Sequence, residues 1–136
     1  MNQPMKRSAV AGLLHAAACL LCTLTAGAGD LPGADDQPFA EAHIVLQLSD
    51  GEEAVQSRVL NGAGNLLKHY GGPDLVDLEI VAFGPGISLL FADSGQQERI
   101  SSLAANGVRF VACMNTVETI ERSTGTRPAL NPLAIP

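Results

Sequence analysis

The chain has 136 residues, a length that fits one domain and would leave two domains too small to bury a useful core. Its formal net charge is −6 and it has no basic block, which disfavours nucleic-acid and anionic-membrane partners because both attract positive charge. Hydrophobic residues make up 46% of the chain, too many for a disordered tail. Aromatic residues, at 4%, provide no stacking platform for bases, and three cysteines are too few for a disulfide-rich scaffold.

The first residues have the pattern of a cleavable signal peptide. Lys6 and Arg7 form a short basic segment, the stretch 8–28 has no charge, and it closes on the small residues Ala-Gly-Ala. This pattern predicts export and cleavage at that site, with a retained membrane anchor as the alternative. We therefore expect a periplasmic protein without membrane contact after cleavage. Removal of residues 1–28 leaves 108 residues, a net charge of −8 and Cys113 as the only cysteine.

The remaining chain begins with a leader and continues as one domain. Residues 29–42 are rich in Gly, Pro and Asp and are expected to be a flexible leader, and residues 43–136 are expected to form a single domain. The apolar run 44–48 predicts a strand covered on both faces, which is typical of a parallel sheet.

The next segment has the signals of a helix. Asp50 is suited to be its N-cap, Glu53 stands in capping-box register, and an apolar stripe continues to about His69. Gly62 and Gly64 each weaken a helix by about 1 kcal/mol relative to alanine, which indicates close backbone approach to a neighbour such as another subunit. A Gly-Gly-Pro sequence then ends the helix.

The rest of the domain repeats this alternation of strand and helix. We expect strands over residues 78–83 and 108–113, and helices over about 96–105 and 115–123. The last helix should begin at Asn115 as a cap.

Two further segments complete the predicted fold. The apolar run 87–91 is either a helical turn or a further strand, and the proline-rich tail 126–136 is expected to end without a strand. Strands that alternate with helices predict right-handed βαβ units. The expected fold class is therefore α/β, a three-layer doubly wound parallel sheet with helices on both faces.

Candidate functional residues stand where the predicted strands end, because ligands of open parallel sheets bind outside the carboxyl ends of the strands. Cys113 lies at such an end and directly before a helix, where free N–H groups and the helix dipole favour a thiolate. It is the candidate catalytic residue, and a buried structural cysteine is the alternative. The candidate substrate-binding residues at these ends are Asp50, Gly84, Pro85, Gly86 and Asn115.

Other kinds of site have little support. His43 and His69 have no metal-ligand spacing with each other or with Cys113. The Gly-Pro-Gly turn is not G-x-G-x-x-G, and Pro85 lacks the N–H that a phosphate would need. No G-x-S-x-G elbow of a hydrolase is present. We therefore expect no metal and no cofactor.

Several segments together resemble the DsrE/DsrF-like family of intracellular sulfur oxidation proteins, in its exported branch. They are the strand 43–48, the helix segment 59–67 (VLNGAGNLL), the segment 80–87 (IVAFGPGI) and the segment 110–116 (FVACMNT). The resemblance covers about residues 43–124. Its most specific parts are F-x-A-C-x-N-T and the strand-end G-P-G.

The resemblance implies an α/β fold and a homo-oligomer. It also implies that Cys113 accepts sulfur as a persulfide and hands it to a partner protein, with Asn115 and the Gly84-Pro85-Gly86 loop shaping the pocket. The relay members of the family are mostly cytoplasmic, whereas this chain is expected to be exported. The family continues with another strand and helix, so we expect a truncated C-terminus or a sheet edge completed by a partner.

Two functions follow from these observations. The first is a thiol-based sulfur carrier that exchanges sulfur with a donor or acceptor protein. The alternative is a non-enzymatic homo-oligomeric binding module, since the sequence offers no acid/base pair and no metal set. In both cases a carrier or binding protein is favoured over a classical enzyme.

Overall fold

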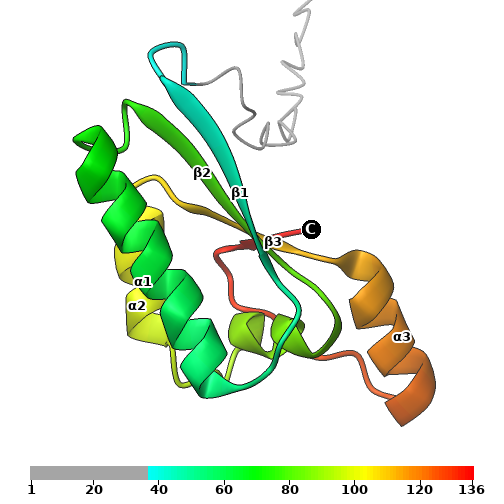
Figure 1. The fold of residues 1–136 in the computed structure, drawn as a ribbon. Helices are drawn as coiled ribbons and strands as arrows, with labels where there is room; N and C mark the ends of the chain where they lie inside the picture. Colours follow the sequence, from blue (N-terminus) through cyan, green and yellow to red (C-terminus); the bar gives the residue numbers. More distant parts are fainter. Residues whose placement is uncertain (1–36) are drawn as a thin grey trace, which may run out of the picture.

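The computed structural model of the protein describes residues 37–136, so the predicted signal peptide and most of the predicted leader lie outside the described residues. Strands and helices alternate along this part of the chain (Figure 1). In chain order they are β1 (Ala42–Leu48), α1 (Glu53–Tyr70), β2 (Val76–Ala82), the 3-10 helix η2 (Gly84–Leu90), α2 (Gln97–Ala105), β3 (Arg109–Ala112), α3 (Met114–Thr124) and β4 (Ala134–Ile135).

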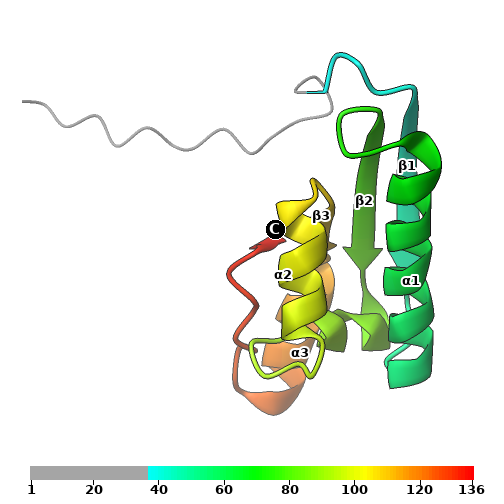
Figure 2. The ribbon, with the colours of Figure 1, turned by 90° about the vertical axis from the view of Figure 1, so that its left-hand side faces the viewer.

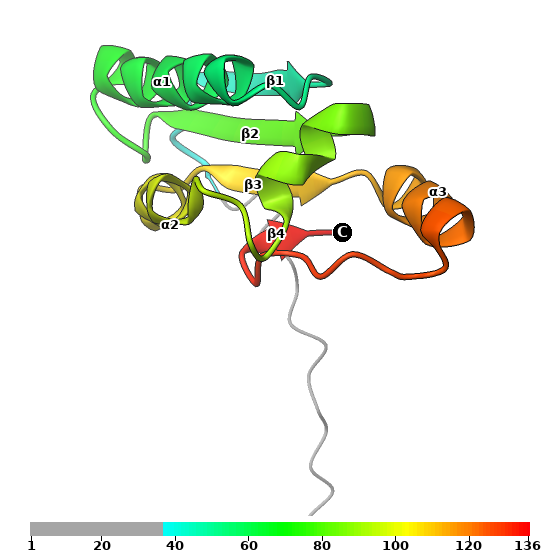
Figure 3. The same ribbon diagram turned by 90° about the horizontal axis from the view of Figure 1, so that it is seen from below.

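The four strands form one parallel sheet in the order β1-β2-β3-β4. The predicted α/β fold class with a parallel sheet is therefore confirmed. The doubly wound, three-layer arrangement was wrong for residues 37–136, because the strands follow one another in chain order and such connections place their helices on the same face of the sheet. Helices α1 and α2 lie in front of the sheet in Figure 2 and cover one of its faces. Helix α3 lies past the end of β3, on the opposite side of the molecule from α1 and α2 in Figure 3.

The core lies between the sheet and the two helices α1 and α2. Side chains of the central strands that point to these helices are fully buried, among them Leu78, Ile80 and Phe110. They meet Leu60 of α1 and Ile100 of α2, which are also buried. Burial of such large apolar side chains contributes about 1.5–3 kcal/mol each, which makes this interface the main source of stability.

Strand β1 differs from the prediction that it is covered on both faces. Its residues alternate between exposed and partly buried positions, with Ile44 and Leu46 turned to the core and His43, Val45 and Gln47 exposed. The prediction was wrong because β1 is an edge strand whose one face is covered by α1 and whose other face has no such cover. An alternating pattern of this kind is typical of a strand with one solvated face.

The start of α1 also differs from the prediction. Asp50 is not the N-cap, because the helix begins at Glu53 and its N-cap position is occupied by Glu52. The carboxylate of Asp50 instead accepts a hydrogen bond of 2.8 Å from the backbone N–H of Glu52, as in an Asx turn. The helix ends as predicted, since Gly71 adopts a left-handed conformation with φ of 86°.

The close backbone approach expected at the two glycines of α1 is absent within residues 37–136. A Cβ atom at Gly62 would meet nothing within 4 Å, and one at Gly64 would lie 4.0 Å from a methyl of Leu103. The prediction was therefore wrong for the contacts within this chain. Longer side chains connect α1 and α2, such as Arg99, which donates to Asn61 over 2.6 Å.

The C-terminal part departs from the sequence prediction at two points. Helix α3 begins at Met114 with Cys113 at the N-cap position, so Asn115 lies inside the helix and does not cap it. The tail was predicted to have no strand, but β4 pairs in parallel with β3. Buried Asn131 holds the tail against the domain, because its backbone N–H donates to the carbonyl of Leu90 over 2.8 Å.

In the ambiguous run 87–91, residues 87–90 form the second part of the 3-10 helix η2 and Phe91 follows its end. No helix in the described part of the chain is both long and apolar enough to span a membrane.

Candidate functional site

The carboxyl ends of β1, β2 and β3 are joined by backbone hydrogen bonds. The N–H of Phe83 donates to the carbonyl of Leu48, and the N–H of Cys113 donates to the carbonyl of Ala82, each over 3.0 Å. These bonds extend the sheet by one residue past β2 and β3. They bring the start of η2 and the start of α3 to the same edge.

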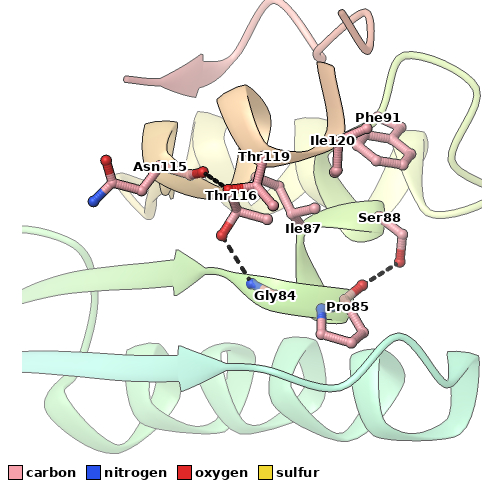
Figure 4. Close-up of a pocket in the computed structure, with 9 residues that line it drawn as sticks. All are labelled: Gly84, Pro85, Ile87, Ser88, Phe91, Asn115, Thr116, Thr119 and Ile120. Atoms are coloured by element: carbon pink, nitrogen blue, oxygen red, sulfur yellow. Dashed lines mark hydrogen bonds between the residues drawn. The ribbon is translucent and has the colours of Figure 1, made fainter. Parts of the chain in front are cut away.

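Gly84 connects η2 to the first turn of α3. Its backbone N–H donates to Oγ1 of Thr116 over 3.0 Å (Figure 4). Its φ of 51° lies in the left-handed region, which glycine adopts without the steric cost of a Cβ atom. The glycine at this strand end therefore serves the turn that sets η2 against α3.

Gly86 allows η2 to pack closely against the end of β1. A Cβ atom at this position would lie 2.3 Å from the carbonyl oxygen of Leu48, so only glycine allows η2 to approach the end of β1 this closely. Gly86 is buried and does not line the neighbouring pocket. Its place in the structure is that of a packing residue beneath the site.

Cys113 is a free cysteine, partly buried, at the N-cap position of α3. The side-chain hydroxyl of Thr116 is the largest influence on its sulfur and lowers the pKa of the thiol. The backbone N–H groups of Thr116 and Asn115 lower the pKa further, and burial opposes them only in part. Hydrogen bonds to the charged form stabilise it, so the thiolate is favoured at this position.

The Thr116 hydroxyl is held in place for this role. Its oxygen accepts the hydrogen bond from Gly84, which leaves its own proton to be donated. The contact between η2 and α3 therefore sets the orientation of this hydroxyl.

We expect a Thr116→Val variant to have a higher thiol pKa at Cys113, because valine keeps the shape but removes the hydroxyl. The rate of iodoacetamide alkylation against pH measures this pKa, and the variant should react more slowly at neutral pH. Thr116→Ser keeps a hydroxyl and should react like the unchanged protein. Equal pH profiles for the valine and serine variants would refute the role of the hydroxyl.

A pocket of about 540 Å³ lies between η2 and α3 (Figure 4). On one side it is lined by η2 and the residue after it, through Gly84, Pro85, Ile87, Ser88 and Phe91. On the other side it is lined by Asn115, Thr116, Thr119 and Ile120. The latter four share one face of α3, because residues four apart lie one turn above each other.

The structure brings some of the predicted site residues together and separates others. Gly84, Pro85 and Asn115 line the pocket, and Cys113 is the N-cap residue of α3, directly before the turn that lines it. Asp50 is exposed, does not line the pocket and is engaged with the backbone of the turn before α1.

The sequence analysis did not propose the remaining lining residues as site residues. Thr116, Thr119 and Ile120 could have been found, because they share the helix face of Asn115. Ile87 and Phe91 could not, since the run that contains them was compatible with both helix and strand.

The two histidines considered as metal ligands lie elsewhere. His43 is on β1, with Nδ1 3.1 Å from a carboxylate oxygen of Asp77, and His69 is near the end of α1. Within residues 37–136, no three His, Cys, Asp or Glu side chains are grouped so that they could hold a metal ion.

Comparison with known proteins supports the fold. No family model and no curated protein matches the chain. The chain is similar to a solved structure, the protein of unknown function MTH1491 from Methanobacterium thermoautotrophicum, with 28% sequence identity and a TM-score of 0.54. The match covers 63% of this chain and 71% of that chain. The chain therefore has an α/β fold in common with MTH1491, and membership of the DsrE/DsrF-like family stays a prediction.

Proposed function

We propose that the protein is an exported DsrE-like sulfur carrier that takes up sulfur on Cys113 as a persulfide. The observation that supports this most directly is the position of Cys113 at a strand end and helix start, where Thr116 and backbone N–H groups favour the thiolate. The thiolate is the nucleophilic form of cysteine, and Cys113 is only partly buried. The export part of the proposal depends on residues 1–28 and would place the protein in the periplasm.

The transfer step is an exchange and needs no external oxidant. The Cys113 thiolate attacks the outer sulfur of a donor persulfide, a new S–S bond forms, and the S–S bond of the donor breaks. The donor leaves as a thiolate and the proton of the persulfide stays in the products. Passing the sulfur to an acceptor thiol is the same step in reverse.

Incubation of the full chain with inorganic polysulfide, followed by mass spectrometry of peptides, tests the proposal. The peptide with Cys113 should gain about 32 Da, the mass of one sulfur atom, and lose it on reduction. Cys113→Ser should show no gain at this peptide. A wild-type peptide that stays unchanged while a small-molecule thiol in the same solution is converted would overturn the proposal.

The alternative, a homo-oligomeric binding module, rests on a different observation. Val45 on the edge strand β1 is 58% exposed, and β1 pairs only with β2 among the residues the structure describes. An edge strand of this kind is a site where a second chain can add. Light scattering at micromolar concentration separates an oligomer from a monomer. An oligomer whose Cys113 takes up no sulfur would favour the module over the carrier.

A further inference from the structure

The pocket between η2 and α3 has no charged side chain in its lining. Its apolar walls are Ile87, Phe91 and Ile120, which come from both sides of the opening (Figure 4). Its volume of about 540 Å³ lies in the range of about 300–1,000 Å³ that is usual for small-molecule sites. The size and the walls suit a small molecule with an apolar body.

The hydroxyl groups of the lining are already engaged within the protein. Ser88 Oγ donates to the carbonyl of Pro85 over 2.9 Å and accepts from Gln56 over 3.0 Å. Thr119 Oγ1 donates to the carbonyl of Asn115 over 2.7 Å and accepts from Arg122 over 3.0 Å. The hydroxyls of Ser88 and Thr119 therefore form their hydrogen bonds within the protein. The surface that these residues offer to the pocket is largely made of carbon atoms. A ligand rich in charge would lose its hydration here without a partner in return.

Thr116 joins this pocket to the cysteine. It lines the pocket, and its backbone N–H donates over 3.0 Å to the carbonyl of Cys113, the N-cap residue of the same helix. A molecule whose apolar body fills the pocket can therefore extend its reactive atom past Thr116 toward Cys113.

We propose that the pocket binds an uncharged, largely apolar organic thiol or persulfide of low molecular weight, whose sulfur is exchanged with Cys113. This inference rests on the proposed carrier function and adds the class of its substrate. In the exchange the Cys113 thiolate attacks the outer sulfur of the bound persulfide, and the organic thiolate leaves. A free thiol in the pocket takes the sulfur back by the reverse step.

Two uncharged reagents that differ only in an apolar ring test the pocket. Methyl and benzyl methanethiosulfonate both transfer their S-alkyl group to a thiolate and release methanesulfinate. The rate at Cys113 is followed by peptide mass spectrometry, and glutathione serves as the reference thiol. The ratio of benzyl to methyl rate constants should be about tenfold higher at Cys113 than at glutathione, because the ring is buried during the reaction.

Variants decide whether the pocket causes this preference. Ile120→Asn makes an apolar wall polar and should reduce the ratio to that of glutathione. Thr119→Asp places a carboxylate at an exposed position of the lining and should do the same without disturbing the core. Val45→Asn is the matched control, since it makes the same kind of change at an exposed position on β1 outside the pocket. It should keep the high ratio.

The outcomes separate this inference from the carrier function. Inorganic polysulfide needs no apolar pocket, so Val45→Asn, which lies outside the pocket, should gain sulfur at Cys113 as the unchanged protein does. The protein could take up sulfur from polysulfide and still show the same ratio of benzyl to methyl rate constants at Cys113 as glutathione. This result would overturn the proposed substrate class but not the carrier function. A ratio that stays high in both pocket variants also overturns the substrate class. Absence of sulfur uptake from polysulfide overturns the carrier function and also the substrate class that depends on it.

Discussion

Replacing Gly86 with alanine should lower the free energy of unfolding by about 3 kcal/mol. The new Cβ atom would lie 2.3 Å from the carbonyl oxygen of Leu48 and 2.7 Å from its carbonyl carbon. Both atoms belong to the backbone at the end of β1, which cannot rotate away as a side chain could. The start of η2 must therefore move, and with it one wall of the pocket beside Cys113.

Urea unfolding followed by circular dichroism measures this loss. Gly62→Ala is the matched control, because a Cβ atom there meets nothing within 4 Å and the position lies inside α1. That variant should gain about 1 kcal/mol, the difference in helix propensity between the two residues. Equal stability of the two variants would contradict the close approach of η2 to β1.

Replacing Arg109 with methionine should also cost about 3 kcal/mol at neutral pH, because it leaves a buried carboxylate without its main partner. Asp77 is 4% exposed, and Arg109 binds it with both guanidinium nitrogens while Nη2 also lies 3.2 Å from Glu79. Among the residues that the structure describes, His43, with Nδ1 3.1 Å away, is the hydrogen-bond partner that remains for Asp77 in this variant. The side chains of this cluster lie on the sheet face turned away from α1 and α2.

Two controls separate a buried ion pair from a surface one. Asp77→Asn combined with Arg109→Met removes both charges and should cost less than Arg109→Met alone. Arg127→Met breaks the exposed pair with Glu121 and should change stability by at most about 1 kcal/mol. A double variant no more stable than the single one would contradict the assignment of an unpaired charge at Asp77.

The loss in free energy of unfolding caused by Arg109→Met should depend on pH. Burial raises the pKa of Asp77, but the hydrogen bonds from Arg109 and His43 outweigh it and hold the pKa below its ordinary value. The ionised carboxylate of Asp77 thus stabilises the folded protein fully above the unfolded-state pKa of about 3.9. This stabilisation is lost as pH falls through the lower pKa of Asp77 in the folded state. Unfolding at neutral pH and at about pH 3 should show a smaller deficit in acid. A constant deficit would exclude this ionisation as the cause.

Local sequence patterns predicted most of the elements. The helices α1 and α2 and the strands β2 and β3 lie within a few residues of their expected positions, because apolar periodicity and glycine signals act over short stretches of chain. Gly71 and Gly125 end their helices in the left-handed conformation, as expected from the lack of a Cβ atom. Helix starts were less predictable, because Asp50 can accept a backbone hydrogen bond in a turn as well as in a cap.

The candidate site was predicted in part. The junction of β3 and α3 placed Cys113 at the carboxyl edge of the sheet, and the sequence around it was enough to find this junction. The sequence could not show that Thr116 accepts a hydrogen bond from Gly84, since these two residues are far apart along the chain. It also could not show which apolar residues of the ambiguous run 87–91 would line a pocket and which would enter the core.

By itself, then, the sequence determined the alternation of strands and helices, the parallel sheet that follows from it, and the place of Cys113 at the sheet edge. Only the tertiary structure decided what depends on contacts between distant segments. It paired β4 with β3, left one face of β1 exposed, and set η2 against α3 to form the pocket. The physical reason is that propensity and periodicity act within one element, whereas pairing, burial and pocket shape depend on which elements meet.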